Sequence, residues 1–260
     1  ELAHGLSIRL VGSMFNLQSR GMGEGWSDYF GLSLLARSTH DIAGTFVSGG
    51  YTTLQLGTPA FNNNYYFGIR RFPYSTDLGV NPLTFADIDP SQYQVPADVP
   101  RSPLVNLAIS PDASSVHNQG EVWCSALMDA RALLWARDGF AANQRMMQLV
   151  VDGMKLGPGN PTFLQSRDAI LQADLVNNAS ADYVPLWTAF ARRGMGAAAT
   201  SPGSSTTRGV SESFRPPFYT EFEYPSGRPD RLAPGLSASF TVRITGVSLT
   251  LTPGTQRLVY

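Results

Sequence analysis

Cysteine, lysine and histidine are scarce in this chain of 260 residues. Cys124 is the one cysteine, which excludes an intrachain disulfide and a cysteine-rich metal site. Nineteen basic and twenty acidic residues leave a formal charge of -1, so the chain lacks the basic surface that nucleic acid requires. No run of about 18 apolar residues occurs, and we therefore expect no transmembrane segment.

The first residues also lack the features of a leader segment. Glu1 is not an initiator methionine, and neither a basic region nor an apolar run follows it. A hydrophobic fraction of 43% with 11% aromatic residues nevertheless predicts a folded, globular protein. We therefore expect this sequence to be a window from a longer protein.

The spacing of apolar residues predicts a mainly α-helical chain with a short β-rich segment at its C-terminus. Residues 1–35 predict two helices joined by a loop around residues 12–23. Prolines punctuate residues 40–116, which predicts a long, loop-rich surface. Further helices are predicted at residues 119–137, 141–154, 164–176 and 181–193.

The composition changes at about residue 196. Residues 197–214 are rich in small and polar side chains and predict a linker. Beyond them apolar residues alternate, as in 236–244 and 249–251, which predicts strands. About 45 residues is short for a complete β-sandwich, so we expect residues 215–260 to be a partial β-sandwich-like module.

The first four residues carry part of a metal-binding pattern. Glu1 and His4 match the end of H-E-x-x-H, whose first histidine would directly precede Glu1. Residues i and i+4 share a helix face, so two such histidines can bind one zinc ion while the glutamate acts as general base on a bound water. An isolated E-x-x-H is common, however, and usually reflects a surface glutamate and a packed histidine.

An acidic pair strengthens the zinc interpretation. Glu24 and Asp28 are i, i+4 on a predicted helix, so Glu24 can bind the metal while Asp28 accepts a hydrogen bond from a ligating imidazole. A solvated acidic face is a poor alternative because Trp26 and Phe30 lie in the same segment. The sequence therefore predicts a zinc site with two histidines and one glutamate.

Six motifs, in order along the chain, closely resemble the fungalysin family of secreted zinc metallopeptidases, relatives of thermolysin. The resemblance runs from residue 1 to about residue 196. The motifs are Glu1-Leu-Ala-His4-Gly-Leu-Ser-Ile-Arg-Leu, Gly-Met-Gly-Glu24-Gly-Trp-Ser-Asp28 and the segments 68–77, 81–85, 116–123 and 160–174.

The resemblance implies the helical C-terminal lobe of a thermolysin-like endopeptidase that binds one Zn²⁺. It assigns Glu1 as the general base, His4 and Glu24 as zinc ligands, Asp28 as the partner of a ligating histidine, and His117 as the donor to the oxyanion. Residues 1–196 would be a partial catalytic domain, which lacks the first zinc-ligand histidine. We expect such a chain to be inactive in isolation.

The resemblance also implies partners and a location. Substrates would be proteins or peptides, cut beside a bulky apolar residue. The full-length precursor would be a secreted zymogen with an N-terminal propeptide.

The position of His117 gives an independent argument for its role. It precedes an amphipathic segment and therefore lies near a helix N-terminus, where the helix dipole disfavours a second proton. An imidazole N–H there can stabilise developing negative charge. Asp112 could orient the ring, and a turn-forming aspartate is an equally good interpretation.

Several other residues have more than one interpretation. Arg70, Arg71 and Tyr74 could line a substrate cleft, and buried packing with ion pairing is at least as good an explanation. His40 is expected to be a loop histidine at a helix C-terminus. Cys124 is expected to behave as a small buried apolar side chain.

Two alternative functions remain. One is a non-catalytic cell-surface or adhesion protein with a degenerate peptidase fold, which predicts a residue other than histidine before Glu1. The other is a zinc exopeptidase, which would need acidic or aromatic residues to capture a free terminal amine. We find no such cluster in the sequence.

Overall fold

The computed structural model describes residues 2–54, 64–227 and 239–248, and Glu1 lies outside them. The chain divides into two compact units, Glu1–Phe214 and Arg215–Tyr260. The described part is mainly α-helical with one small antiparallel sheet, which confirms the predicted fold class. No described helix is long and apolar enough to cross a membrane.

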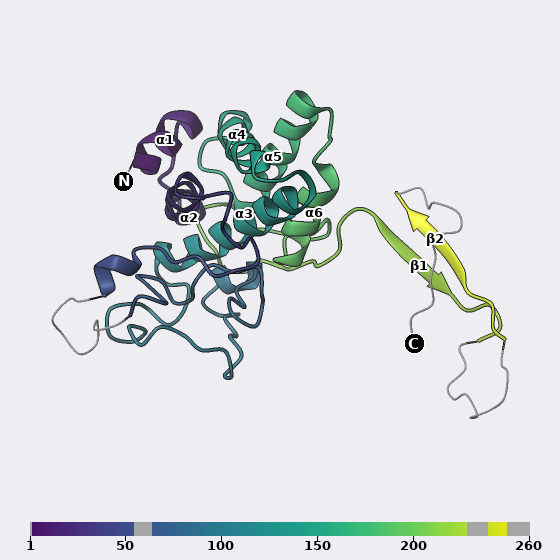
Figure 1. Cartoon of the computed structure of the whole chain (residues 1–260), viewed down its shortest axis with the longest axis horizontal. Helices are drawn as coiled ribbons and strands as arrows, with labels where there is room; N and C mark the ends of the chain where they lie inside the picture. The colour runs from purple at the N-terminus through teal and green to yellow at the C-terminus, as the bar shows by residue number, and fades with distance from the viewer. Residues whose placement is uncertain (1, 55–63, 228–238, 249–260) are drawn as a thin grey trace. The chain divides into compact units, whose positions relative to one another are not determined.

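The first unit is built around one long central helix (Figure 1). This helix, α3, packs against α2, α4 and α6, while α1 packs on α2 and α4, and α5 on α4 and α6. Its buried side chains include Trp123, which makes edge and stacked contacts with three other aromatic rings. The helices are α1 (Leu2–Val11), α2 (Leu17–Leu34), α3 (Val116–Asp138), α4 (Ala141–Leu156), α5 (Phe163–Asn178) and α6 (Tyr183–Arg192).

The start of α2 differs from the sequence prediction. A loop was expected around residues 12–23, whereas the helix already begins at Leu17. Gly21, which lies in the expected loop, is instead a helical residue packed against α3, since a Cβ on it would lie 2.8 Å from the Cβ of Gln119. A Cβ on Gly25 would lie 2.5 Å from the carbonyl oxygen of Gly120, so the two backbones approach too closely for a side chain.

The proline-rich stretch between α2 and α3 is loop-rich, as predicted. Among its described residues the helical elements are two short 3-10 helices, η1 (Gly50–Thr53) and η2 (Phe85–Ile88). The loops are nevertheless anchored in the core by apolar side chains that are fully buried, namely Phe72, Tyr74, Leu83, Phe85 and Ile88. These anchors let a segment without long helices hold polar groups in fixed positions.

Residues 197–214 belong to the first unit, whereas their composition predicts a linker. Thr200 pairs with Ser211 in an isolated antiparallel bridge, and Gln18 Nε2 donates to the Thr206 carbonyl at 2.7 Å. Glu212 Oε1 accepts a hydrogen bond from the Ala86 backbone at 2.8 Å. These polar contacts reach residues far away in sequence, which local composition does not reveal.

The second unit contains one β-hairpin in its described part. Strand β1 (Tyr219–Glu223) pairs antiparallel with β2 (Arg243–Val247), and the register places Phe222 opposite Ile244. The predicted strand at 249–251 lies outside the described residues. The proposed partial β-sandwich-like module therefore stays a prediction.

Candidate active site

Three helices bring three of the predicted site residues together. Glu24 Oε2 on α2 lies 3.6 Å from His4 Nε2 on α1 and 3.4 Å from His117 Nε2 at the start of α3. The side chain of Glu24 is 18% exposed, whereas those of His4 and His117 are 32% and 55% exposed. Two imidazoles therefore face one carboxylate at the protein surface.

Glycines on the helix surfaces allow this convergence. A Cβ on Gly120 would lie 2.7 Å from the Cβ of Glu24, and one on Gly23 would lie 3.5 Å from His4 Nδ1. Contacts under 3.0 Å require something to move, so a side chain at position 120 would displace Glu24. The close crossing of α2 and α3 is therefore what places Glu24 beside His117.

The contacts of Glu24 suit a metal better than a direct hydrogen bond. Hydrogen bonds of this kind are about 2.7–3.2 Å long, and both separations exceed that range. Two ligands of a tetrahedral zinc ion lie about 3.3 Å apart, since each lies about 2.0–2.1 Å from the metal. Both imidazoles lie at about this separation from Glu24, so the distances do not distinguish His4 from His117 as a second zinc ligand. Within the described residues, no group of three histidine, cysteine, aspartate or glutamate side chains could hold a metal ion.

Glu1 precedes α1 and lies outside the described residues. Its role as general base therefore stays a prediction.

The loop before α3 fixes the position of His117. Ser115 caps the helix, since its hydroxyl accepts from the His117 backbone N–H, and the same oxygen lies 3.3 Å from His117 Nδ1. Asp112 Oδ1 accepts from the Ser114 backbone at 2.9 Å, and this bonding lowers the pKa of Asp112. The Asp112 carboxylate thus bonds to the backbone two residues further on, as expected for an aspartate that forms a turn. Ser115, which sequence reasoning did not single out, contacts the His117 ring.

One helical turn beyond Glu24, Asp28 is buried in a network of hydrogen bonds. Its carboxylate accepts two bonds from Arg70, at 2.6 and 2.9 Å, one from Ser48 at 2.9 Å and one from the Tyr74 hydroxyl. Burial alone would raise the pKa of Asp28, but Arg70 and the hydrogen bonds keep it below its ordinary value. The predicted contact of Asp28 with a ligating histidine stays a prediction.

One helical turn beyond His117, Glu121 forms the matching network on α3. Its carboxylate accepts from the backbone and the Nε of Arg71, both at 2.9 Å, and Arg71 also donates to the Asn118 carbonyl. Sequence reasoning missed Glu121, although its i+4 spacing from His117 was a usable signal. Arg70, Arg71 and Tyr74 thus act through buried packing and ion pairing, the second of the two interpretations given above.

Small cavities adjoin the site on two sides. One of about 150 Å³ is bordered by His4, Arg20 and Glu24, and one of about 250 Å³ by Arg70, Ile109 and His117. His40 lies in the turn after α2, with its backbone N–H bonded to the Arg37 carbonyl, as expected for a loop histidine. Cys124 is buried, as predicted.

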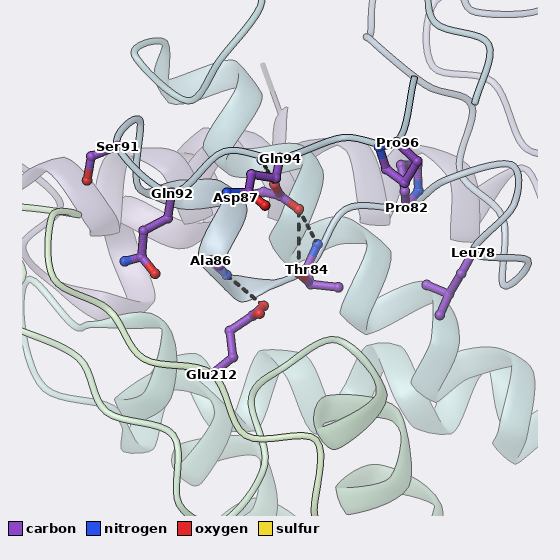
Figure 2. Close-up of a pocket in the computed structure, with 10 residues that line it drawn as sticks. All are labelled: Leu78, Pro82, Thr84, Ala86, Asp87, Ser91, Gln92, Gln94, Pro96 and Glu212. Atoms are coloured by element: carbon purple, nitrogen blue, oxygen red, sulfur yellow. Dashed lines mark hydrogen bonds between the residues drawn. The ribbon is translucent and has the colours of Figure 1, made fainter. Parts of the chain in front are cut away.

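A larger hollow of about 590 Å³ lies elsewhere, around η2 (Figure 2). Asp87 Oδ2 accepts from the Thr84 backbone at 2.8 Å, and Glu212 points at the Ala86 N–H, so both carboxylates are bound to the backbone. Burial raises the pKa of Asp87 to about 6. This hollow shares no lining residue with the two cavities beside Glu24 and His117.

Comparisons with known proteins identify relatives of this chain. The chain is 33% identical to the extracellular metalloproteinase mep of Aspergillus fumigatus over 222 residues, which cover 76% of this chain and 30% of the relative. It is also 33% identical to extracellular metalloproteinase 4 of Arthroderma otae, covering 76% and 29%, and 32% identical to extracellular metalloproteinase 1 of Trichophyton equinum, covering 76% and 30%. The chain thus spans less than a third of the length of these relatives.

The family profile of fungalysin metallopeptidases (M36) matches residues 1–199. That match covers the helical unit with Glu24 and both neighbouring histidines. The chain therefore belongs to the fungalysin metallopeptidase family.

Proposed function

We propose that this chain supplies the helical part of the active site of an extracellular zinc endopeptidase. The observation that carries the proposal is the convergence of His4 and His117 on the Glu24 carboxylate. Secretion is supported by the names of the relatives, which are extracellular metalloproteinases. A propeptide would precede the catalytic part in the full-length precursor.

His4 and Glu24 would hold the zinc ion, and a histidine directly before Glu1 would be its third protein ligand. A bound zinc ion supplies Lewis acidity, which polarises a peptide carbonyl and lowers the pKa of water. The partial exposure of His4 and Glu24 leaves room for substrate to reach this point.

The remaining residues would move and hold protons. Glu1 would accept a proton from the attacking water and deliver it to the leaving amine nitrogen, as a general base and then a general acid. His117 would donate its Nε2 hydrogen to the oxyanion that develops on the substrate, and the Ser115 cap would fix the ring for this. Substrates would be proteins or peptides cut beside a bulky apolar residue.

The experiment compares two glutamate variants in an enzyme that includes the residues before Glu1. Glu1→Gln should retain about one zinc per chain and lose casein cleavage, because a general base is removed while the ligands remain. Glu24→Gln is the matched control and should lose zinc as well as activity. Zinc content is measured by atomic absorption.

Two results would contradict the assignments. Substantial casein cleavage by Glu1→Gln would exclude Glu1 as the base. Full zinc content in Glu24→Gln would exclude Glu24 as a required zinc ligand, and a residue other than histidine before Glu1 would favour the non-catalytic alternative.

A further inference from the structure

The two proposed zinc ligands lie on different helices, which are joined by a short loop. His4 lies on α1, which ends at Val11, and Glu24 lies on α2, which begins at Leu17. The separation of His4 and Glu24 therefore depends on how this loop, residues 12–16, is held, as well as on the packing of α1 against α2.

Asn160, between α4 and α5, binds the loop on both sides of Met14. Its backbone N–H donates to the Ser13 carbonyl at 2.7 Å, and its Nδ2 donates to the Ser13 hydroxyl at 2.6 Å. Its Oδ1 accepts from the backbone N–H groups of Phe15, at 2.7 Å, and Asn16, at 3.0 Å. One residue, at least 144 positions further along the chain, thus holds the loop through four hydrogen bonds.

The backbone of Asn160 suits this role. Its φ is 52°, in the left-handed region that asparagine adopts more readily than most residues other than glycine. The side chain of Asn16, at the N-cap position of α2, makes no capping hydrogen bond to its own helix. The start of α2 is therefore held from outside, in part by Asn160.

Met14 carries this restraint to the proposed zinc ligands. Its side chain belongs to the hydrophobic core. A Cβ on Gly23 would lie 3.4 Å from Met14 Cε and 3.5 Å from His4 Nδ1, so the Met14 side chain and the His4 ring both cover Gly23. Gly23 directly precedes Glu24 in the chain. A displaced loop would therefore remove the support beside the His4 ring.

We propose that Asn160 is a positioning residue for the zinc site and fixes His4 relative to Glu24 by holding the loop between their helices. The inference rests on the proposed zinc endopeptidase function. Residues that orient metal ligands without touching the metal contribute about 10–100-fold in metal affinity. Because Asn160 acts through a further contact, its side chain should contribute about tenfold, the lower end of that range.

The test measures zinc dissociation constants by competition with a chelating dye, in an enzyme that includes the residues before Glu1. Asn160→Gly removes the side chain but keeps a residue that adopts positive φ, and it should bind zinc about tenfold more weakly than the wild type. Asn160→Asp keeps acceptor oxygens for the two backbone N–H groups and lets the Ser13 hydroxyl donate. This conservative variant should therefore retain most of the zinc affinity.

Asn143→Ala is the matched control, because it removes a hydrogen bond to the other end of α2. Asn143 Nδ2 on α4 donates to the Ser33 carbonyl at 3.0 Å, near the C-terminus of α2. This variant should lose stability in urea denaturation and keep the wild-type zinc affinity. If Asn160 had a purely structural role, Asn160→Gly would behave in the same way.

Met14→Ala tests the inference without changing Asn160. It should also weaken zinc binding, because the His4 ring loses the side chain beside it. Wild-type zinc affinity in either Asn160→Gly or Met14→Ala overturns the proposal, as does an equal loss of affinity in Asn143→Ala and Asn160→Gly. A wild-type enzyme that binds no zinc would contradict the proposed function itself, and this inference with it.

Discussion

Two consecutive turns of the packed helices α2 and α3 differ in how their charged residues are exposed to solvent. In the first turn, Glu24 and His117 lie 3.4 Å apart and are partly exposed. In the next turn, Asp28 and Glu121 are buried and bonded to consecutive arginines. The same helix crossing therefore keeps one pair of residues free for chemistry and uses the other pair to hold the helices in place.

The difference shows how a partly exposed site can still be rigid. Exposed charged pairs contribute little to stability, so Glu24 and His117 cannot fix their own separation. The buried networks one turn away, together with the contact between Gly25 and Gly120, determine that separation instead. Five substitutions test this contrast between exposed and buried charged groups, and their expected effects decrease in the order given.

Arg71→Met should have the largest effect on stability. It leaves the Glu121 carboxylate buried without its guanidinium partner, which costs about 3–5 kcal/mol of the free energy of unfolding. Urea denaturation measures the loss. A second change, Glu121→Gln, should recover most of it because the buried charge is then removed. A loss below about 1 kcal/mol would mean that this network does not hold the helices.

In an enzyme that includes the residues before Glu1, His117→Ala should reduce catalysis and leave stability unchanged. Loss of one oxyanion donor lowers kcat by about 10²–10³-fold, and the side chain of His117 is 55% exposed. Steady-state peptide hydrolysis and zinc content are measured together. His40→Ala, another exposed histidine, is the control and should retain full activity. If His117→Ala loses zinc, His117 is a metal ligand and its assignment here is wrong.

Asp87→Asn tests a buried carboxylate whose pKa is raised, whereas the pKa of the buried Asp28 is lowered. The pKa of Asp87 rises from 3.8 to about 6, so the folded state binds its proton more tightly than the unfolded state. Its stabilising contribution, about 3 kcal/mol, is complete below pH 3.8 and disappears as the pH rises through about 6. The unfolding free energy of the wild type should therefore fall between pH 4 and 7 relative to Asp87→Asn.

Asp28→Asn gives the opposite sign. The pKa of Asp28 is lowered, so its contribution is present above its ordinary pKa and is lost as the pH falls through the lower folded value. Chemical denaturation of both variants, measured from acidic pH up to pH 7, distinguishes Asp28 from Asp87. Parallel pH profiles for both variants would contradict the contrast between them.

Gly120→Ala comes last in the series and should destabilise the fold by about 1–3 kcal/mol. The added methyl group would meet the Glu24 Cβ at 2.7 Å and the Gly25 nitrogen at 2.7 Å, which forces α2 and α3 apart. Zinc affinity should fall with stability. Gly31→Ala on α2 is the control, since nothing lies within 4 Å of its Cβ, and it should stabilise the helix by about 0.5–1 kcal/mol. Equal effects of the two changes would contradict the close-crossing argument.

Sequence patterns predicted the parts of this protein that depend on local information. The helices α3 to α6 follow from apolar spacing within each segment, and Glu24 and His4 follow from i, i+4 patterns and the family motifs. The early start of α2 could not be predicted, because Gly21 favours a loop until Gln119 of α3 packs against it.

Polar pairs between residues far apart in the chain also could not be predicted from the sequence. Arg71 and Glu121 are separated by fifty positions, and nothing in either segment marks them as partners. Two hydrogen bonds of residues 197–214 are of the same kind. One joins Thr206 to Gln18, and the other joins Glu212 to Ala86. Such pairs arise only when distant segments are folded together.

The two arginines that bind Asp28 and Glu121 are neighbours in the chain, and this has a consequence for how the family can vary. One dipeptide in an otherwise irregular stretch serves both helices, so inserting or deleting a residue between Arg70 and Arg71 would disrupt both anchors at once. Surface loops elsewhere in that stretch can change length freely. Evolutionary drift in loop length should therefore be found on either side of this dipeptide and never within it.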